Sequence, residues 1–76
     1  MKNIKLIRVI KDYTQIKVQM ETGINQSILS KYEQGLVMPT SENLIILAKF
    51  YNTSVDFLLD LTDEQKPYPK KQNAKE

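Results

Sequence analysis

The stretch Tyr13–Gly35, YTQIKVQMETGINQSILSKYEQG, decides the expected fold. It predicts two short helices that meet at Gly23, a residue that adopts the left-handed conformation after a helix at little cost. Thr14 is a good N-cap for the first helix and Asn25 for the second, which ends at Gly35. Two short helices joined at a glycine occur in proteins that bind nucleic acids and also in many helical hairpins that bind nothing.

The second of these helices has one apolar and one polar side. At roughly 100° per residue, Ile28, Leu29 and Tyr32 cluster on one side. The opposite side carries Gln26, Ser27, Ser30, Lys31 and Gln34. Such amides and hydroxyls can read base edges, and a glutamine can bond N6 and N7 of adenine together. The alternative is that these side chains bind only water on an exposed surface and have no ligand.

The whole chain predicts an all-α fold, a compact bundle of five short helices. The expected helices span about 3–11, 14–22, 25–33 and 40–51, and a short fifth helix begins at Ser54. Apolar spacing in the fourth helix predicts a buried set made of Leu44, Ile45, Leu47, Ala48 and Tyr51. In the fifth helix Asp56 and Asp60 are expected to point outward. No alternating strand pattern competes with this interpretation.

The length of 76 residues allows one domain with a small core. We expect residues 1–65 to form it and residues 66–76, with Pro67, Pro69 and four lysines, to be a disordered basic tail. The net charge is +3 over residues 1–35, −4 over 36–65 and +3 over 66–76. This asymmetry favours a protein that turns one end toward a polyanion. A hydrated surface with unevenly distributed charge would show the same pattern.

Several classes of function are disfavoured by the residues that are missing. The chain has no cysteine and no histidine, so thiolate or imidazole metal ligands and the commonest general base are unavailable. With only two glycines, it has no glycine-rich phosphate loop. The longest apolar run, 44–48, is far shorter than a membrane span. We therefore expect a cytoplasmic protein that is not an enzyme and uses no metal, cofactor or small-molecule ligand.

Four motifs resemble, in order, the Cro and phage-repressor-like helix-turn-helix family. They are TQ, G-I-N-Q-S-x-L-S-K-Y-E-x-G, P-T-x-E-N-L-x-x-L-A and S-V-D-F-L-L, and they lie within residues 4–62. The resemblance implies a lambda-repressor-like domain that binds double-stranded DNA and regulates transcription, most simply as a repressor. It further implies that helix 25–33 enters the major groove and that a homodimer occupies a two-fold operator.

The resemblance also assigns roles to individual residues. The base-reading positions of the family match Gln26, Ser27 and Lys31. Phosphate contacts or positioning roles are expected, from the resemblance and from helix N-termini, at Thr14, Gln15, Lys17, Asn25, Ser30 and Gln34. Arg8 and Glu33 match a pair of residues that form a structural ion pair across the domain.

Four features depart from the family pattern, and the fourth lies on the first helix. Gln19 replaces a residue that is usually small, so either the packing angle of the two helices changes or the amide turns outward. Thr22 replaces a large aliphatic residue, which predicts a thinner core at the second helix. The loop 36–38 is apolar where many relatives carry a phosphate-binding Lys or Arg.

The first helix carries a second apolar stripe. Ile7, Arg8 and Lys11 are expected to share the core side with Ile4, and the residues near the opposite side are Leu6, Val9 and Ile10. We expect this stripe, with Leu36, Val37 and Met38, to serve self-association or to be tolerated exposure. A rival interpretation is a protein-interaction module that binds a regulator or a toxin, with weak or no DNA binding.

Overall fold

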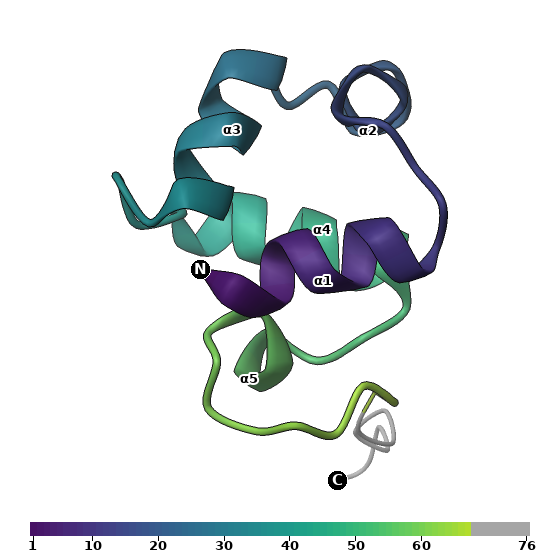
Figure 1. The fold of residues 1–76 in the computed structure, drawn as a ribbon, viewed down its shortest axis with the longest axis vertical. Helices are drawn as coiled ribbons and strands as arrows, with labels where there is room; N and C mark the ends of the chain where they lie inside the picture. Colours follow the sequence, from purple (N-terminus) through teal and green to yellow (C-terminus); the bar gives the residue numbers. More distant parts are fainter. Residues whose placement is uncertain (68–76) are drawn as a thin grey trace, which may run out of the picture.

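Five helices and no strand make up the part of the chain that the structure, a computed structural model, describes: residues 1–67. The helices are α1 Lys2–Ile10, α2 Gln15–Thr22, α3 Gln26–Gln34, α4 Ser41–Tyr51 and α5 Val55–Leu58. Figure 1 shows α2 almost end-on beside α3, with α1 and α4 below them and α5 beneath α1. The all-α, lambda-repressor-like fold predicted from the sequence is confirmed.

The helix caps and the two glycine turns form where the sequence predicts them. The hydroxyl of Thr14 accepts a hydrogen bond from the main-chain N–H of Lys17 at 3.0 Å, which caps α2. Gly23 ends α2 with φ of 79° and Gly35 ends α3 with φ of 74°, in the left-handed region. The remaining helices α3, α4 and α5 are capped by the side chains of Asn25, Thr40 and Ser54.

The core lies where all five helices meet. Its fully buried members come from every helix and include Ile4, Ile7, Val18, Leu29, Leu47, Tyr51, Phe57 and Leu58. Helix α2 packs on α3, and α1 packs on both α3 and α5. A hydrogen bond of 2.8 Å from the Asn43 amide to the Tyr32 hydroxyl joins α4 to α3. The core therefore fixes the orientation of α3.

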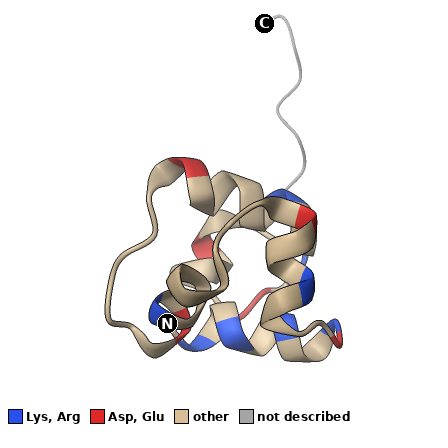
Figure 2. Ribbon diagram, turned by 90° about the horizontal axis from the view of Figure 1, so that it is seen from above, with Lys and Arg blue, Asp and Glu red and all other residues tan. Residues whose placement is uncertain are grey.

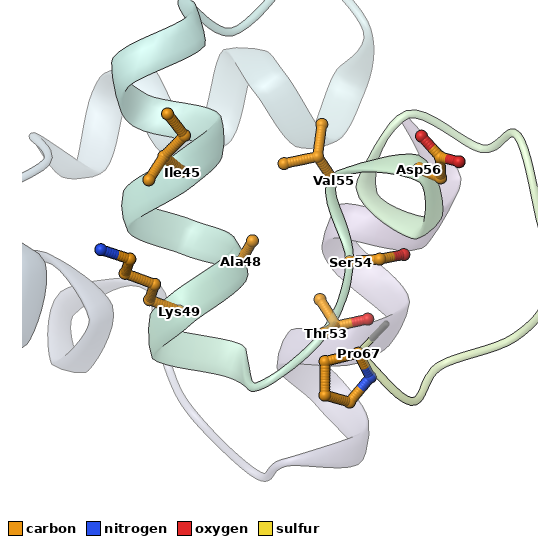
Figure 3. A pocket seen from close by; sticks show the side chains of 8 residues that line it. All are labelled: Ile45, Ala48, Lys49, Thr53, Ser54, Val55, Asp56 and Pro67. Atoms are coloured by element: carbon orange, nitrogen blue, oxygen red, sulfur yellow. The ribbon is translucent and has the colours of Figure 1, made fainter. Parts of the chain in front are cut away.

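Two expectations about side-chain direction are wrong. Lys11 is exposed, because α1 ends one residue earlier and Lys11 is only its C-cap. Ile45 is 50% exposed, while its neighbour Ile46 packs against the core instead. Figure 3 shows Ile45 with Ala48 and Val55 lining a surface pocket between α4 and α5. Asp60 is exposed, as expected, and its carboxylate accepts hydrogen bonds from the main-chain N–H groups at the start of α1.

The end of the described chain is fastened to the domain. The hydroxyl of Thr53 donates a hydrogen bond to the main-chain oxygen of Gln65 at 2.6 Å. Lys66 and Pro67 are exposed, and the rest of the expected tail, 68–76, lies outside the described residues. Within residues 1–67, no helix has both the length and the apolarity needed to cross a membrane.

Candidate nucleic-acid interface

Helix α3 presents a polar outer side. Leu29 and Tyr32 are buried beneath the helix and Ile28 is half-buried. On the opposite side Ser27, Lys31 and Gln34 are exposed, and Gln26 and Ser30 are half-buried. The amide of Gln34 donates to the Ser30 hydroxyl at 2.8 Å, so these two side chains lie together one turn apart. The candidate base readers Gln26, Ser27 and Lys31 thus share one helix surface.

Gln26 is held by two glutamines of α2. Its side-chain Nε2 donates to Oε1 of Gln15 at 2.6 Å. Its main-chain N–H donates to Oε1 of Gln19, also at 2.6 Å. The first residue of the candidate recognition helix is therefore fixed at both its backbone and its side chain.

Arg8 and Glu33 form an ion pair beneath this surface. Arg8 Nε lies 2.6 Å and Nη2 lies 3.0 Å from the two Glu33 carboxylate oxygens, a bidentate arrangement. The side chains are only 13% and 4% exposed. The hydrogen bond with Glu33 raises the pKa of the Arg8 guanidinium and outweighs the opposing effect of burial. Arg8 also donates to the main-chain oxygen of Tyr13 at 2.7 Å, which joins α1 to the start of the motif.

Gln15 connects the ion pair to the outer surface. Its Nε2 donates to Oε1 of Glu33 at 3.0 Å while its Oε1 accepts from Gln26. A continuous series of hydrogen bonds therefore runs from Arg8 through Glu33 and Gln15 to Gln26. The sequence assigned Gln15 a positioning role, but nothing in its spacing indicated the contact with Glu33.

The remaining candidate phosphate contacts lie near helix N-termini. Thr14 and Asn25 are exposed caps, and the Asn25 carboxamide oxygen accepts from the main-chain N–H of Ser27 at 2.8 Å. Lys17 is exposed, and its ammonium group lies 3.0 Å from Glu21 one turn along α2. A pair this exposed contributes little to stability, so Lys17 can leave it for another anion at small cost.

Gln19 and Thr22 explain how this chain tolerates its departures from the family pattern. The Gln19 amide does not bend away from the motif; it fills the space between α2 and α3 and caps the first amide of α3. Thr22 donates to the main-chain oxygen of Val18 at 2.7 Å and accepts from the N–H of Ile24 at 3.1 Å. Polar contacts therefore stabilise the turn between α2 and α3, at a position where the resemblance implied a large aliphatic residue.

The capping role of Gln19 is a feature that sequence reasoning missed. A usable signal existed, because a helix N-terminus leaves several N–H groups without intrahelical partners and Asn25 supplies an acceptor for one of them. Sequence reasoning also did not single out Ile16 and Met20 of α2, which are 54% and 74% exposed.

Charge alone does not define the interface. Figure 2 shows basic segments on several helices with acidic segments interspersed among them. The loop Leu36, Val37 and Met38 is 42–68% exposed and carries no charge. Among residues 1–67, no cluster of acidic side chains has the arrangement of a metal site. The polar side of α3 and the caps beside it are therefore the best-defined candidate for contact with nucleic acid.

Comparison with known proteins agrees with this geometry. A family model described as helix-turn-helix matches residues 4–58, so the chain belongs to the helix-turn-helix family, of the Cro and repressor type. A relative from Bacillus subtilis (strain 168), described as an uncharacterized HTH-type transcriptional regulator, YobD, is 33% identical over 73 residues. The match covers 96% of this chain but 65% of that relative, so this chain spans somewhat under two thirds of its length. No solved structure matches this chain.

Proposed function

We propose that this protein is a sequence-specific DNA-binding transcriptional regulator that inserts α3 into the major groove. The observation that carries the proposal is the outer side of α3, where five polar side chains face away from a buried apolar side. An α-helix fits the width of the major groove, and only there does every base pair present a distinct donor and acceptor pattern.

Base contacts come from Gln26, Ser27 and Lys31. The Gln26 amide hydrogen-bonds adenine, and the Ser27 hydroxyl accepts from or donates to a base edge. Lys31 donates to a guanine or to a phosphate. Around them the positioning contacts to phosphate come from two cap residues, from two residues in the first turn of α2 and from two polar residues of α3: Thr14, Asn25, Gln15, Lys17, Ser30 and Gln34. These contacts set the register of the helix and carry no sequence information themselves.

The regulator acts as a homodimer on a two-fold operator and represses by occupying it. Half-sites for such dimers are centred about one helical turn apart, roughly 34 Å. The proposed self-association surface is made of exposed apolar residues of α1 and of the loop after α3: Leu6, Val9, Ile10, Leu36, Val37 and Met38.

Selection of bound duplexes from a random pool tests this function. We expect one enriched sequence with two-fold symmetry, and affinity that falls with salt by about 0.9 in log–log slope for each phosphate neutralised. Gln26→Ala should change which sequences bind, whereas Lys17→Ala should weaken all sequences alike. A flat salt response, or no retention on DNA at low salt, contradicts DNA binding.

A protein-interaction module of the same fold is the second candidate. The exposed apolar residues of α1 and the uncharged loop favour it, because each of Leu6, Val9, Ile10, Leu36, Val37 and Met38 is at least 40% exposed. In that case a partner protein such as a regulator or a toxin covers this surface, and DNA is bound weakly. Substitutions on the polar side of α3 would then leave binding of the partner unchanged.

A further inference from the structure

Asn25 and Ser27 lie two residues apart at the start of α3 and are joined by two hydrogen bonds. The Asn25 carboxamide oxygen accepts from the main-chain N–H of Ser27 at 2.8 Å and from its hydroxyl at 2.6 Å. We propose that Asn25 fixes the Ser27 hydroxyl as an acceptor, so that Ser27 selects bases that carry an amino group in the major groove. This inference rests on the proposed DNA binding and deepens it, because it names the bases that Ser27 selects and gives Asn25 a role in specificity.

The orientation of the Asn25 amide is set by the backbone of α3. A main-chain N–H can only donate a hydrogen bond. The N–H of Ser27 belongs to the first turn of α3, where no carbonyl of the helix can accept from it, and Asn25 caps it with its oxygen. An amide turned the other way would place its NH₂ group against this N–H and leave it without an acceptor. Asn25 therefore keeps its oxygen toward Ser27.

The Ser27 hydroxyl takes its direction from the same oxygen. An amide oxygen only accepts, so the hydroxyl that lies 2.6 Å from it is the donor. A serine hydroxyl has a single hydrogen and two lone pairs. With its hydrogen directed to Asn25, Ser27 offers only lone pairs to a ligand. Because Ser27 is exposed on the outer side of α3, a base edge can approach these lone pairs.

The polarity of the Ser27 hydroxyl divides the four bases into two groups. In the major groove adenine presents an amino group at N6 and cytosine presents one at N4, whereas guanine and thymine present only hydrogen-bond acceptors. A hydroxyl that only accepts can bond either amino group. To bond guanine or thymine, Ser27 would have to turn its hydrogen away from Asn25 and lose that bond. Ser27 therefore favours adenine or cytosine on the strand that it faces.

Ser30, about one turn further along α3, is hydrogen-bonded with the opposite polarity. Its hydroxyl accepts from the Gln34 amide at 2.8 Å and so keeps its own hydrogen. A hydroxyl with a free hydrogen can donate to a phosphate oxygen, and such a contact carries no sequence information. The two serines of α3 therefore differ in their expected roles: Ser27 selects a base, and Ser30 positions the helix.

Three substitutions and one control test the role of Asn25. Ser27→Ala identifies the operator position that Ser27 reads. Asn25→Gly removes the cap oxygen, yet glycine is itself accepted at the N-cap with little loss of stability, so this variant should fold. Asn25→Asp keeps an oxygen that accepts from Ser27 and has no NH₂ group. Ser30→Ala is the matched control, because it removes a hydroxyl of α3 that bonds Gln34 and not Asn25.

The readout is the base preference at the operator position whose selectivity Ser27→Ala abolishes. Anisotropy titrations use four duplexes that differ only there, at a temperature where melting curves show each variant folded. We expect the wild type to prefer adenine or cytosine over guanine and thymine about fivefold, the effect of one neutral hydrogen bond. Asn25→Gly should lower this preference to about twofold or less. Asn25→Asp and Ser30→Ala should retain it even where their affinity falls.

The outcomes separate this inference from the proposed function. If the wild type prefers guanine or thymine, or if Ser27→Ala changes the selectivity at no position, the inference is overturned and DNA binding stands. An unchanged preference in Asn25→Gly, or a lost preference in Asn25→Asp, also overturns it. If Asn25→Gly loses selectivity equally at the position that Gln26→Ala identifies, general loosening of α3 explains the result and the inference fails. If the wild type binds no duplex, the proposed function fails and this inference fails with it.

Discussion

The side chains of Asp60 and Asn3 each form hydrogen bonds with main-chain groups close to the other residue. Together these bonds join α1 to the segment that follows α5. Oδ1 of Asp60 accepts from the main-chain N–H of Asn3 at 2.8 Å, and its Oδ2 accepts from the N–H of Lys2 at 3.1 Å. In return the buried Asn3 amide donates to the main-chain oxygens of Phe57 and Thr62 at 2.9 and 3.2 Å. Met1 offers no side-chain cap, so a residue distant in sequence caps α1.

Loss of this cap should destabilise the domain measurably. Asp60→Ala removes the acceptor, which costs about 1 kcal/mol, and places alanine at φ of 63°, which costs roughly 1 kcal/mol more. The melting temperature should therefore fall clearly, since about 1 kcal/mol corresponds to roughly 4–8 °C in a domain of this size.

Two control variants separate the cap from the backbone conformation. Asp60→Asn keeps an acceptor and tolerates the left-handed region, so it should retain most of the stability. Asp60→Gly loses only the acceptor and should lie between asparagine and alanine. Equal melting temperatures for glycine and asparagine would show that the hydrogen bonds to α1 contribute nothing.

The Arg8–Glu33 ion pair should be costly to break from one side. Arg8→Met or Glu33→Leu leaves a charge in a largely buried position, and such changes cost about 3–5 kcal/mol. A domain of this size has a stability of only about 3–5 kcal/mol, so either variant should be largely unfolded by circular dichroism at room temperature.

The double variant Arg8→Met with Glu33→Leu is the informative comparison. It removes both charges and should recover part of the loss, because no unpaired charge remains. If either single variant keeps the wild-type melting temperature, the pair has no structural role. If the double variant loses as much stability as the two single variants together, the cost comes from lost packing and not from an unpaired charge.

The sequence predicts local features of this domain better than distant contacts. The caps at Thr14 and Asn25 and the left-handed Gly23 follow from rules that involve a few neighbouring residues, and each forms where predicted. The error at Ile45 has a different origin, because Ile45 and Ile46 are both apolar and helical spacing alone cannot decide which one the core will cover.

Contacts across the chain needed the structure. The pairing of Arg8 with Glu33 was accessible only through family resemblance, since the residues lie on different helices. Two contacts, Asp60 with the start of α1 and Gln19 with Gln26, depend on how the helices pack, and helical periodicity indicated neither of them. Polar side chains that bond distant backbone groups are the class of interaction that periodicity does not reveal.

Tyr51 allows the cost of a buried hydroxyl without a hydrogen-bond partner to be measured. Its ring is fully buried and packs 5.3 Å from Phe50 and 6.4 Å from Tyr13 between ring centroids. Its hydroxyl is buried and has no hydrogen-bond partner among residues 1–67. A buried unsatisfied polar group costs about 1–3 kcal/mol, so Tyr51→Phe should raise the stability by about 1 kcal/mol in urea unfolding. A decrease would show that the hydroxyl is satisfied.

The same variant should change the response to alkaline pH. Burial, and next the negative charge of Glu33, raise the pKa of Tyr51 in the folded protein, whereas the unfolded chain releases this proton near pH 10. Above about pH 10 the unfolded state therefore binds fewer protons, and stability falls by up to about 1.4 kcal/mol per pH unit. The Tyr51→Phe variant should lack this contribution to the loss of stability above pH 10. If stability falls with pH in parallel for the wild type and the variant, Tyr51 makes no such contribution.

The apolar stripe on α1 yields a prediction about assembly. Leu6, Val9 and Ile10 are 40%, 56% and 50% exposed on one small helix, and exposed apolar groups gathered on one element commonly mark an interface. If this surface joins two copies, Leu6→Glu with Ile10→Glu buries charges in the interface and halves the mass measured by light scattering. Ile16→Glu with Met20→Glu, on the even more exposed apolar side of α2, should leave the mass unchanged. A wild-type mass equal to the monomer, or an unchanged mass in the α1 variant, removes this surface as the dimer contact.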